Sequence, residues 1–293
     1  MKDIALLIGN DINNISPGVS WAELLQKITD FCQVSDRVTI HKEKPFPMLY
    51  EEIFLAAIKT KQIEERDLKA FIAANVAQID QNDIHHQIRA LSAANIMTTN
   101  YDYTLQGTNL LKNTGVVVER LYSIFRRNEL NGTNYWHLHG EANHPMSINL
   151  GFEHYCGQLQ NMRNYVVTGT DYTSPNVAKA SLLKRLQSKK ALANQSWIDL
   201  FFTKDIFILG LALDFIETDL WWLLTFRARS KFYKNKISIT NKIYYYIPEG
   251  YVALSKHKLD LLKVNGVEVI SIKAPNKLNY YHQVLESIDK LCD

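Results

Sequence analysis

The sequence predicts an α/β fold of the Rossmann-like type, in which helices flank a parallel sheet. Short apolar runs of strand length occur at Ile4–Ile8, Ile96–Thr99 and Ile206–Leu209, and segments with helical spacing of apolar residues separate them. Each run is followed by glycine or short polar residues. Because the carboxyl ends of parallel strands border the ligand crevice in such sheets, we expect the functional residues at those ends.

The length and composition of the chain indicate its domain organisation. At 293 residues the chain is long enough for one large domain with a substantial core. We expect a single domain over residues 1–293, with a helical insertion at about 35–90 and a second helical segment at about 150–200. Apolar residues make up 46% of the chain and charged residues 22%, which argues against extended disorder.

Charge, cysteine content and apolar runs argue against several classes of protein. A formal net charge of +3, with scattered basic residues, is too small to predict nucleic-acid binding. The 3 cysteines are far apart, so we expect neither a disulfide framework nor a paired-cysteine zinc site. No apolar run reaches the length of a membrane span, and polar residues rather than a signal cleavage site follow Ile4–Ile8. We therefore expect a cytoplasmic protein without membrane contact.

The turn after Ile4–Ile8 is the first candidate ligand contact. Gly9 admits a close approach of a ligand to the backbone. Asn10 and Asp11 are candidates for side-chain contacts, although an ordinary Asx turn explains them equally well. Downstream, Ser20 and Glu23 form a capping-box pattern that predicts a helix start.

The segment Thr98-Thr99-Asn100-Tyr101-Asp102 follows the central apolar run. The pattern predicts a strand that ends at Asn100, with Asp102 capping a helix that contains Tyr103, Leu105 and Leu110. The Asn100 amide both donates and accepts hydrogen bonds, so it can hold a sugar hydroxyl or a water molecule. The alternative is that Asn100 and Asp102 only cap a helix and a turn.

The segment His137-Leu138-His139-Gly140 carries two candidate bases. Alternation predicts that both histidines lie on one face of a short strand that Gly140 ends. An imidazole exchanges protons near neutral pH, as a general base requires. A structural role and a His-x-His metal site are the alternatives.

Several further elements follow from the same patterns. A late strand ends at Gly210, and Asp214 with Glu217 three residues later predicts a cap for the next helix. The remaining predictions are strands at 115–119, 242–247 and 267–272, helices at 53–58, 68–76, 83–91, 152–165, 177–193 and 280–291, and an exposed turn at 126–129.

The Thr-Asn-Tyr-Asp and His-x-His-Gly segments, in this order and spacing, resemble the sirtuin-like (SIR2-like) superfamily. The resemblance implies that NAD is bound at the carboxyl ends of the strands, with Asn100 and His139 as catalytic residues and His137 as the alternative base. It further implies a set of candidate dinucleotide contacts: Gly9, Asn10, Asp11, Thr98, Thr99, Asp102, Gly210 and Asp214.

The chain departs from zinc-bearing sirtuins in three ways. Gly9-Asn10-Asp11 stands where those proteins have a Gly-Ala-Gly turn, and Ala212 stands where a serine is expected. No cysteine lies between Cys32 and Cys156, so the four-cysteine zinc module is absent and we expect no zinc. The missing zinc module and the helical insertion favour water over an acyl-lysine as the nucleophile.

The zinc-free bacterial branch implies a specific activity. We expect an NAD hydrolase that releases nicotinamide and ADP-ribose and depletes NAD in anti-phage defence. The resemblance also implies a homo-oligomer restrained until a partner, such as a sensor or an ATPase, releases it. The alternatives are a non-catalytic nucleotide-binding module, an NAD-dependent deacylase, and a metal hydrolase that uses His137 and His139.

Overall fold

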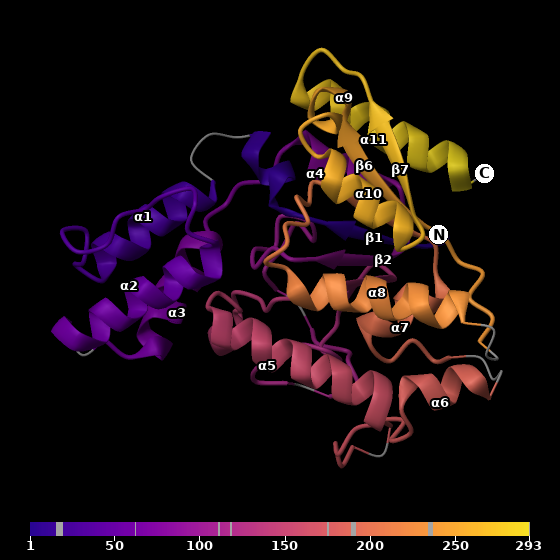
Figure 1. The fold of residues 1–293 in the computed structure, drawn as a ribbon, viewed down its shortest axis with the longest axis horizontal. Coiled ribbons are helices and arrows are strands. Elements are labelled where there is room, and N and C mark those ends of the chain that lie inside the picture. The colour runs from indigo at the N-terminus through magenta and orange to yellow at the C-terminus, as the bar shows by residue number, and fades with distance from the viewer. Residues whose placement is uncertain are drawn as a thin grey trace.

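A seven-stranded sheet forms the centre of the molecule, in the order β3-β4-β2-β1-β5-β6-β7 (Figure 1). The computed structural model describes residues 1–15, 20–61, 63–110, 112–117, 119–174, 176–188, 192–233 and 237–292. All neighbouring strands are parallel except β3 and β4, which are antiparallel. The predicted fold class, a Rossmann-like parallel sheet flanked by helices, is therefore confirmed.

The chain alternates strands and helices along most of its length. The strands are β1 (Lys2–Ile8), β2 (Ala93–Thr98), β3 (Asn128–Leu130), β4 (Thr133–His137), β5 (Ile206–Leu209), β6 (Ile243–Pro248) and β7 (Val267–Ile272). The α-helices are α1 (Trp21–Phe31), α2 (Phe46–Lys61), α3 (Glu65–Val76), α4 (Asp83–Ala90), α5 (Phe152–Arg163), α6 (Leu182–Gln187), α7 (Trp197–Thr203), α8 (Thr218–Phe232), α9 (Glu249–Val252), α10 (Lys256–Val264) and α11 (Lys277–Cys292).

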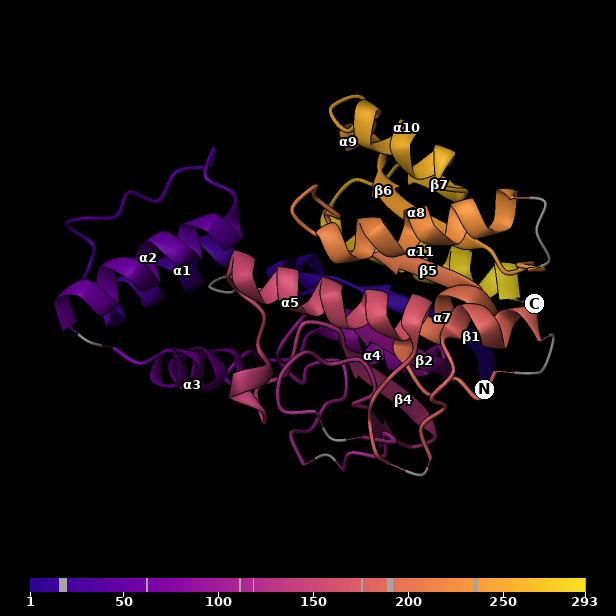
Figure 2. The same cartoon turned by 60° about the horizontal axis from the view of Figure 1, so that its bottom comes forward.

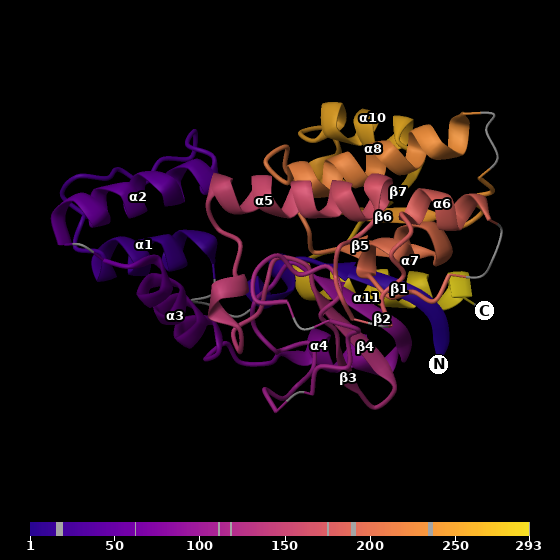
Figure 3. The same ribbon diagram turned by 90° about the horizontal axis from the view of Figure 1, so that it is seen from below.

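Two apolar cores cover the two faces of the sheet. In β1, Leu6 and Ile8 pack on one core and Ala5 and Leu7 on the other, because successive strand residues point to opposite faces. Helices α5, α7, α8 and α10 contribute to the Leu7 core, and α4 and α11 to the Ile8 core. Figure 3 shows these two layers of helices on opposite sides of the sheet. This arrangement buries residues Ile4–Ile8 of β1 on both faces.

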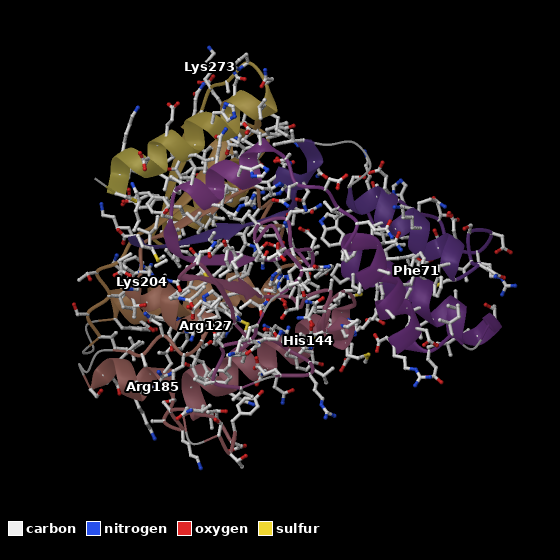
Figure 4. The ribbon with its side chains drawn as sticks, turned by 180° about the vertical axis from the view of Figure 1, so that it is seen from behind. Phe71, Arg127, His144, Arg185, Lys204 and Lys273 are labelled. Carbon is white, nitrogen blue, oxygen red and sulfur yellow. The ribbon has the colours of Figure 1, made fainter. Side chains whose placement is uncertain are left out.

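Helices α1, α2 and α3 form a separate group to one side of the sheet (Figure 2). They share a third apolar core, which also includes Tyr101 and Tyr103 from the loop after β2. Phe31 and Phe71 stack within the group, with ring centroids 4.2 Å apart. Figure 4 shows Phe71 on this group and Lys273, which follows β7, on a distant part of the molecule. The helical group therefore packs against the loop that carries the predicted site.

Some predicted elements take another form in the structure. The strand expected at 115–119 does not form over its described residues 115–117 and 119, and Val118 lies outside the described part of the chain. Instead, β3 pairs antiparallel with β4, so the turn expected at 126–129 is wrong, and Arg126 is only 1% exposed. The helix expected at 177–193 is the shorter α6, and residues 189–191 lie outside the described residues.

Within the described residues, none of the helices combines the length and the apolar character needed to span a bilayer.

Candidate active site

Two glycines bring the ends of β1 and β5 into contact. The Gly9 amide donates to the Leu209 carbonyl at 3.1 Å, and the Asp11 amide donates to the Gly210 carbonyl at 3.0 Å. A Cβ atom at Gly9 would overlap the Gly210 carbonyl oxygen and the Leu211 Cα. Gly210 has a φ of +64°, a conformation that other residues rarely adopt. The two turns therefore form one continuous backbone surface at the carboxyl edge of the sheet.

We call this backbone surface, formed by Gly9 and Gly210, the glycine seam. Asn100 lies beside it, two residues after the end of β2. Its side-chain Nδ2 donates to the Gly9 carbonyl at 3.5 Å, and its backbone amide donates to Thr98 Oγ1 at 3.0 Å. Asn100 is only 3% exposed, yet its Oδ1 has no hydrogen-bond partner among the described residues. A buried amide oxygen of this kind usually has a partner, so this atom is available to a ligand.

Thr98 and Thr99 fasten β2 to β1. Thr98 Oγ1 donates to the Ile8 carbonyl at 2.8 Å, and the Thr99 amide donates to the same carbonyl at 3.3 Å. Both residues are buried. Their hydrogen bonds position Asn100 against Gly9.

Asp102 is part of a buried hydrogen-bond network. Its Oδ2 accepts from Asn13 Nδ2 at 2.9 Å, and its Oδ1 accepts from the Thr104 amide at 3.0 Å and from the Thr104 hydroxyl. Asn13 Nδ2 also donates to Asn10 Oδ1 at 2.9 Å. Asp102 therefore ties the loop after β2 to the 3₁₀ helix Asn10–Ile15.

The helix expected after Asp102 is wrong. Residues 101–110 form turns and bends, and Leu110, which was expected within that helix, is 88% exposed. The hydrogen bonds that the Asp102 carboxylate accepts from Thr104 compete with a helical backbone and favour the turn.

His137 is the last residue of β4, and both of its ring nitrogens have partners. Nδ1 donates to the Asn100 carbonyl at 2.7 Å, and Nε2 lies 2.6 Å from Gln106 Nε2, from which it accepts. The described residues thus satisfy both nitrogens inside the protein, which favours a structural role for His137.

His139 lies outside the strand, in the turn before Gly140. Gly140 has a φ of +97°, and a Cβ there would overlap the Ser147 carbonyl. Because β4 ends at His137, the expectation that both histidines lie on one strand face is wrong. The His139 carbonyl accepts from the Asn149 amide at 2.8 Å, which holds the turn in place.

The His139 imidazole pairs with Asp219 from the first turn of α8. Its Nε2 lies 2.8 Å from Asp219 Oδ2, and the two side chains are 2% and 0% exposed. Burial lowers the pKa of His139, but the charge and hydrogen bond of Asp219 and the charge of Glu217 outweigh burial and raise it. The Tyr155 ring meets the imidazole edge-on, with centroids 5.1 Å apart.

Two cavities open on either side of the segment Gly9–Asp11. Asn10, Asn100 and Asp102 line a small cavity of about 50 Å³. Asp11 and Gly210 line a larger cavity of about 730 Å³ beside the ends of β6 and β7. Five of the predicted residues therefore line one or the other of these cavities, whereas Gly9, Thr98, Thr99 and Asp214 line neither. His139 lines neither of these two cavities.

Asp214 does not occupy the predicted cap position. Helix α8 begins at Thr218 after Glu217, and the N-terminal cap has no side-chain hydrogen bond. The Asp214 carboxylate lies 3.8 Å from Lys258 Nζ and is 65% exposed. Residue 214 contributes backbone contacts instead, because its carbonyl accepts from the Glu217 amide at 3.0 Å.

Three residues of this region carry no local sequence signal for a site. Asp219 of α8 and Tyr155 of α5 contact His139, and Glu217, just before α8, acts on it through its charge. Asp219 is separated from His139 by 80 positions, so only the fold brings the pair together. Burial raises the pKa of Glu217 to about 8, and a strongly perturbed carboxyl group is itself an indicator of functional sites.

The described residues contain no group of three or more His, Cys, Asp or Glu side chains arranged to hold a metal ion. The His137 and His139 rings have separate partners, Gln106 for one and Asp219 for the other. Because each imidazole is hydrogen-bonded to a different side chain, the structure does not favour a metal ion shared by His137 and His139.

The sheet and its glycine turns define a Rossmann-like protein with a candidate ligand site at the carboxyl ends of the strands. Residues 94–202 match a family model described as SIR2-like domain, and this segment includes both Asn100 and His139. The match supports the predicted similarity to the SIR2-like superfamily over these residues, and it is consistent with an NAD-utilising enzyme. A search of curated proteins found no match for the chain.

Proposed function

We propose that this protein is an NAD hydrolase that cleaves the bond between nicotinamide and ribose. The observation that carries the proposal is the arrangement of two cavities around Gly9–Asp11, with Asn10 and Asn100 on one side and Asp11 and Gly210 on the other. A dinucleotide has two ends joined by a diphosphate. The proposed substrate therefore crosses the glycine seam, with its nicotinamide ribose towards Asn100 and its adenosine towards the larger cavity.

The lining of the larger cavity supports an adenosine diphosphate moiety. Its walls include the tyrosines Tyr245, Tyr280 and Tyr281 and the lysines Lys258 and Lys277. Aromatic walls suit a purine ring, and ammonium groups suit phosphate oxygens. Gly9 and Gly210 lack side chains at the point where a diphosphate would meet the backbone.

The chemistry assigned to the other end is a displacement at the ribose. The bond between C1′ and the nicotinamide nitrogen breaks, its electron pair remains with nicotinamide, and positive charge develops on the ribose. A water oxygen then bonds to C1′ and gives up a proton. The proposed role of Asn100 is to orient the ribose and the water, and His139 is the proposed proton acceptor. The products are nicotinamide and ADP-ribose.

Nicotinamide release from NAD tests this proposal. We expect the wild-type chain to release nicotinamide and ADP-ribose, and Asn100→Ala and His139→Ala each to lower kcat on the order of a hundredfold or more. His144→Ala is the matched control, because His144 belongs to the same loop and lines neither cavity. Equal losses in all three variants would contradict the assignment.

The burial of His139 favours a second candidate, a non-catalytic module that binds NAD. His139 is only 2% exposed and contacts neither cavity in this conformation. Tight NAD binding without nicotinamide release, in the isolated chain and in every assembly tested, would support this candidate. A deacylase would instead require an acyl-lysine peptide before any nicotinamide appears, and would transfer the acyl group to ADP-ribose.

The proposed biological role is NAD depletion in bacterial anti-phage defence. The family resemblance supports this role, together with a cytoplasmic location, a homo-oligomer and a protein partner such as a sensor or an ATPase that releases the activity. We further propose that residues 1–293 form a single SIR2-like domain, which the continuous seven-stranded sheet supports. Residues at about 35–90, which include α2 and α3, would be the helical insertion into that domain.

A further inference from the structure

Asp219 holds the proposed base through a single short hydrogen bond. His139 Nε2 and Asp219 Oδ2 are 2.8 Å apart, and the side chains are almost fully buried. Asp219 is the second residue of α8, where the partial positive charge of a helix N-terminus stabilises a carboxylate. The second oxygen, Oδ1, has no hydrogen-bond partner among the described residues, so His139 is the one hydrogen-bonded side chain in contact with this carboxylate.

We propose that Asp219 is the positioning residue of His139: it keeps the proton on Nε2 and leaves Nδ1 as the atom that accepts a proton during the reaction. This inference rests on the proposed NAD hydrolysis and assigns the base to one ring nitrogen.

The acceptor-only character of a carboxylate determines the tautomer. An ionised Asp219 cannot donate, so Nε2 must carry a hydrogen for the contact to be a hydrogen bond. When the imidazolium loses a proton, Asp219 favours retention of the Nε2 hydrogen and Nδ1 becomes the lone-pair nitrogen. The proton released by the attacking water then moves to Nδ1. A neutral side chain at position 219 that can both donate and accept would not determine which ring nitrogen carries the hydrogen.

Other titratable groups surround the pair. Tyr155 from α5 meets the ring edge-on, and Tyr101 after β2 and Glu217 before α8 interact electrostatically with Tyr155. Lys258 from α10 and the exposed Asp214 act on Glu217. Asp219 is the member of this set that hydrogen-bonds to the imidazole. We therefore assign the positioning role to Asp219 and not to Glu217.

Asp219→Asn tests the inference because an amide has nearly the same shape but no charge and can donate as well as accept. We expect kcat for nicotinamide release to fall on the order of a hundredfold, with KM changed by no more than a few fold. Loss of the carboxylate also favours neutral imidazole, so the acid limb of the pH profile of kcat should move to lower pH.

Asp199→Asn is the matched control. Asp199 is also 0% exposed and lies in the first turn of a helix, α7. Its carboxylate instead accepts from Tyr165, Arg185 and the backbone amides of Gln195 and Ser196. We expect this variant to lose stability without any movement of the acid limb. If both variants change kcat and the pH profile alike, the assignment of Asp219 is overturned.

The tautomer can be measured independently of turnover by ¹⁵N NMR of the histidine-labelled protein. We assign the His139 signals by their loss in His139→Ala. The inference requires a protonated Nε2 and an unprotonated Nδ1 in the neutral wild-type ring, and a changed pattern in Asp219→Asn. A neutral ring with the proton on Nδ1 would overturn the inference even if NAD is hydrolysed. Absence of hydrolysis with the required tautomer would instead contradict the proposed function and support the positioning by Asp219.

Discussion

Glu217 illustrates how burial changes a single carboxyl group. Its Oε2 has no hydrogen-bond partner among the described residues. Burial raises the pKa of Glu217 from 4.5 to about 8, with His139 acting in the opposite direction and Asp219 in the same direction. The folded protein therefore binds a proton at Glu217 that the unfolded chain has already released at neutral pH.

This proton makes stability depend on pH. Because the folded pKa is raised, the contribution of Glu217 is fully present below the unfolded pKa and is lost as pH rises through about 8. We expect Glu217→Gln to gain unfolding free energy relative to wild type as pH increases, by at most about 1.4 kcal/mol per pH unit within that window. Urea denaturation at several pH values between 5 and 9 measures the difference.

Glu249→Gln is the control for that experiment, since the Glu249 side chain is 58% exposed. Its difference from wild type should stay nearly constant with pH. A Glu217→Gln difference that is equally flat would mean that Glu217 is ionised in the folded protein.

Individual site residues were predictable where they directly follow an apolar run of strand length. Gly9, Asn100 and Gly210 follow apolar runs, and the structure places all three at the carboxyl ends of strands. The partners of the side chains were not predictable. Asp102 bonds to Thr104 and Asn13 instead of capping a helix, and a side chain's choice among nearby partners depends on packing that the sequence pattern does not contain.

At the scale of elements, the seam between β1 and β5 is the feature most sensitive to volume. A methyl group at Gly9 would overlap backbone atoms of Gly210 and Leu211, which cannot rotate away as a side chain can. We expect Gly9→Ala to lower the unfolding free energy by about 1–3 kcal/mol and to weaken NAD binding. Denaturation and calorimetric titration measure the two effects.

Gly250→Ala provides the comparison, because a Cβ at Gly250 meets nothing within 4 Å. Gly250 lies in α9, where alanine is favoured over glycine by roughly 0.5–1 kcal/mol. This variant should therefore be as stable as wild type or slightly more stable. Similar destabilisation by both substitutions would argue against a specific contact at the seam.

The helices and strands were predictable where their own sequence carries a clear pattern, such as a capping box or an apolar run. The capping box at Ser20 and Glu23 forms as expected, and β1, β6 and β7 lie within a few residues of the expected strands. In contrast, β3 is only 3 residues long and depends on pairing with β4. Such a strand has no periodicity of its own, because its partner provides its stability.

At the scale of the whole molecule, the proposed ligand contacts strands from both halves of the sheet. The small cavity adjoins the end of β2, whereas the larger one adjoins the ends of β5, β6 and β7. Ligand that binds the folded protein and not the unfolded chain stabilises the fold by mass action. We expect NAD at 100 times its Kd to stabilise the catalytically impaired His139→Ala chain by about 2.7 kcal/mol.

Thermal denaturation over a series of NAD concentrations measures this effect, and ADP-ribose should act similarly because it retains the groups assigned to the larger cavity. Nicotinamide alone is the control and should have a much smaller effect. If the midpoint is unchanged by NAD and ADP-ribose, the cavities are not a dinucleotide site.

The fold class was predictable from alternating apolar runs, but the arrangement of the sheet was not. Strand order places β1 between β2 and β5, which are far apart in the chain. The packing of α1–α3 against Tyr101 and Tyr103 is likewise a tertiary contact. Such contacts depend on how well two surfaces fit each other. The sequence pattern predicts that each segment has an apolar surface, but it does not predict which other segment that surface packs against.

The central position of β1 has a consequence for synthesis on the ribosome. β1 ends at Ile8 and β5 begins at Ile206, so residues 9–205 are translated before its second neighbour emerges. At 5–20 residues per second, that interval is roughly 10 to 40 s. During this delay one edge of the apolar segment Ile4–Ile8 lacks its final neighbour, so we expect chaperones to bind the nascent chain there.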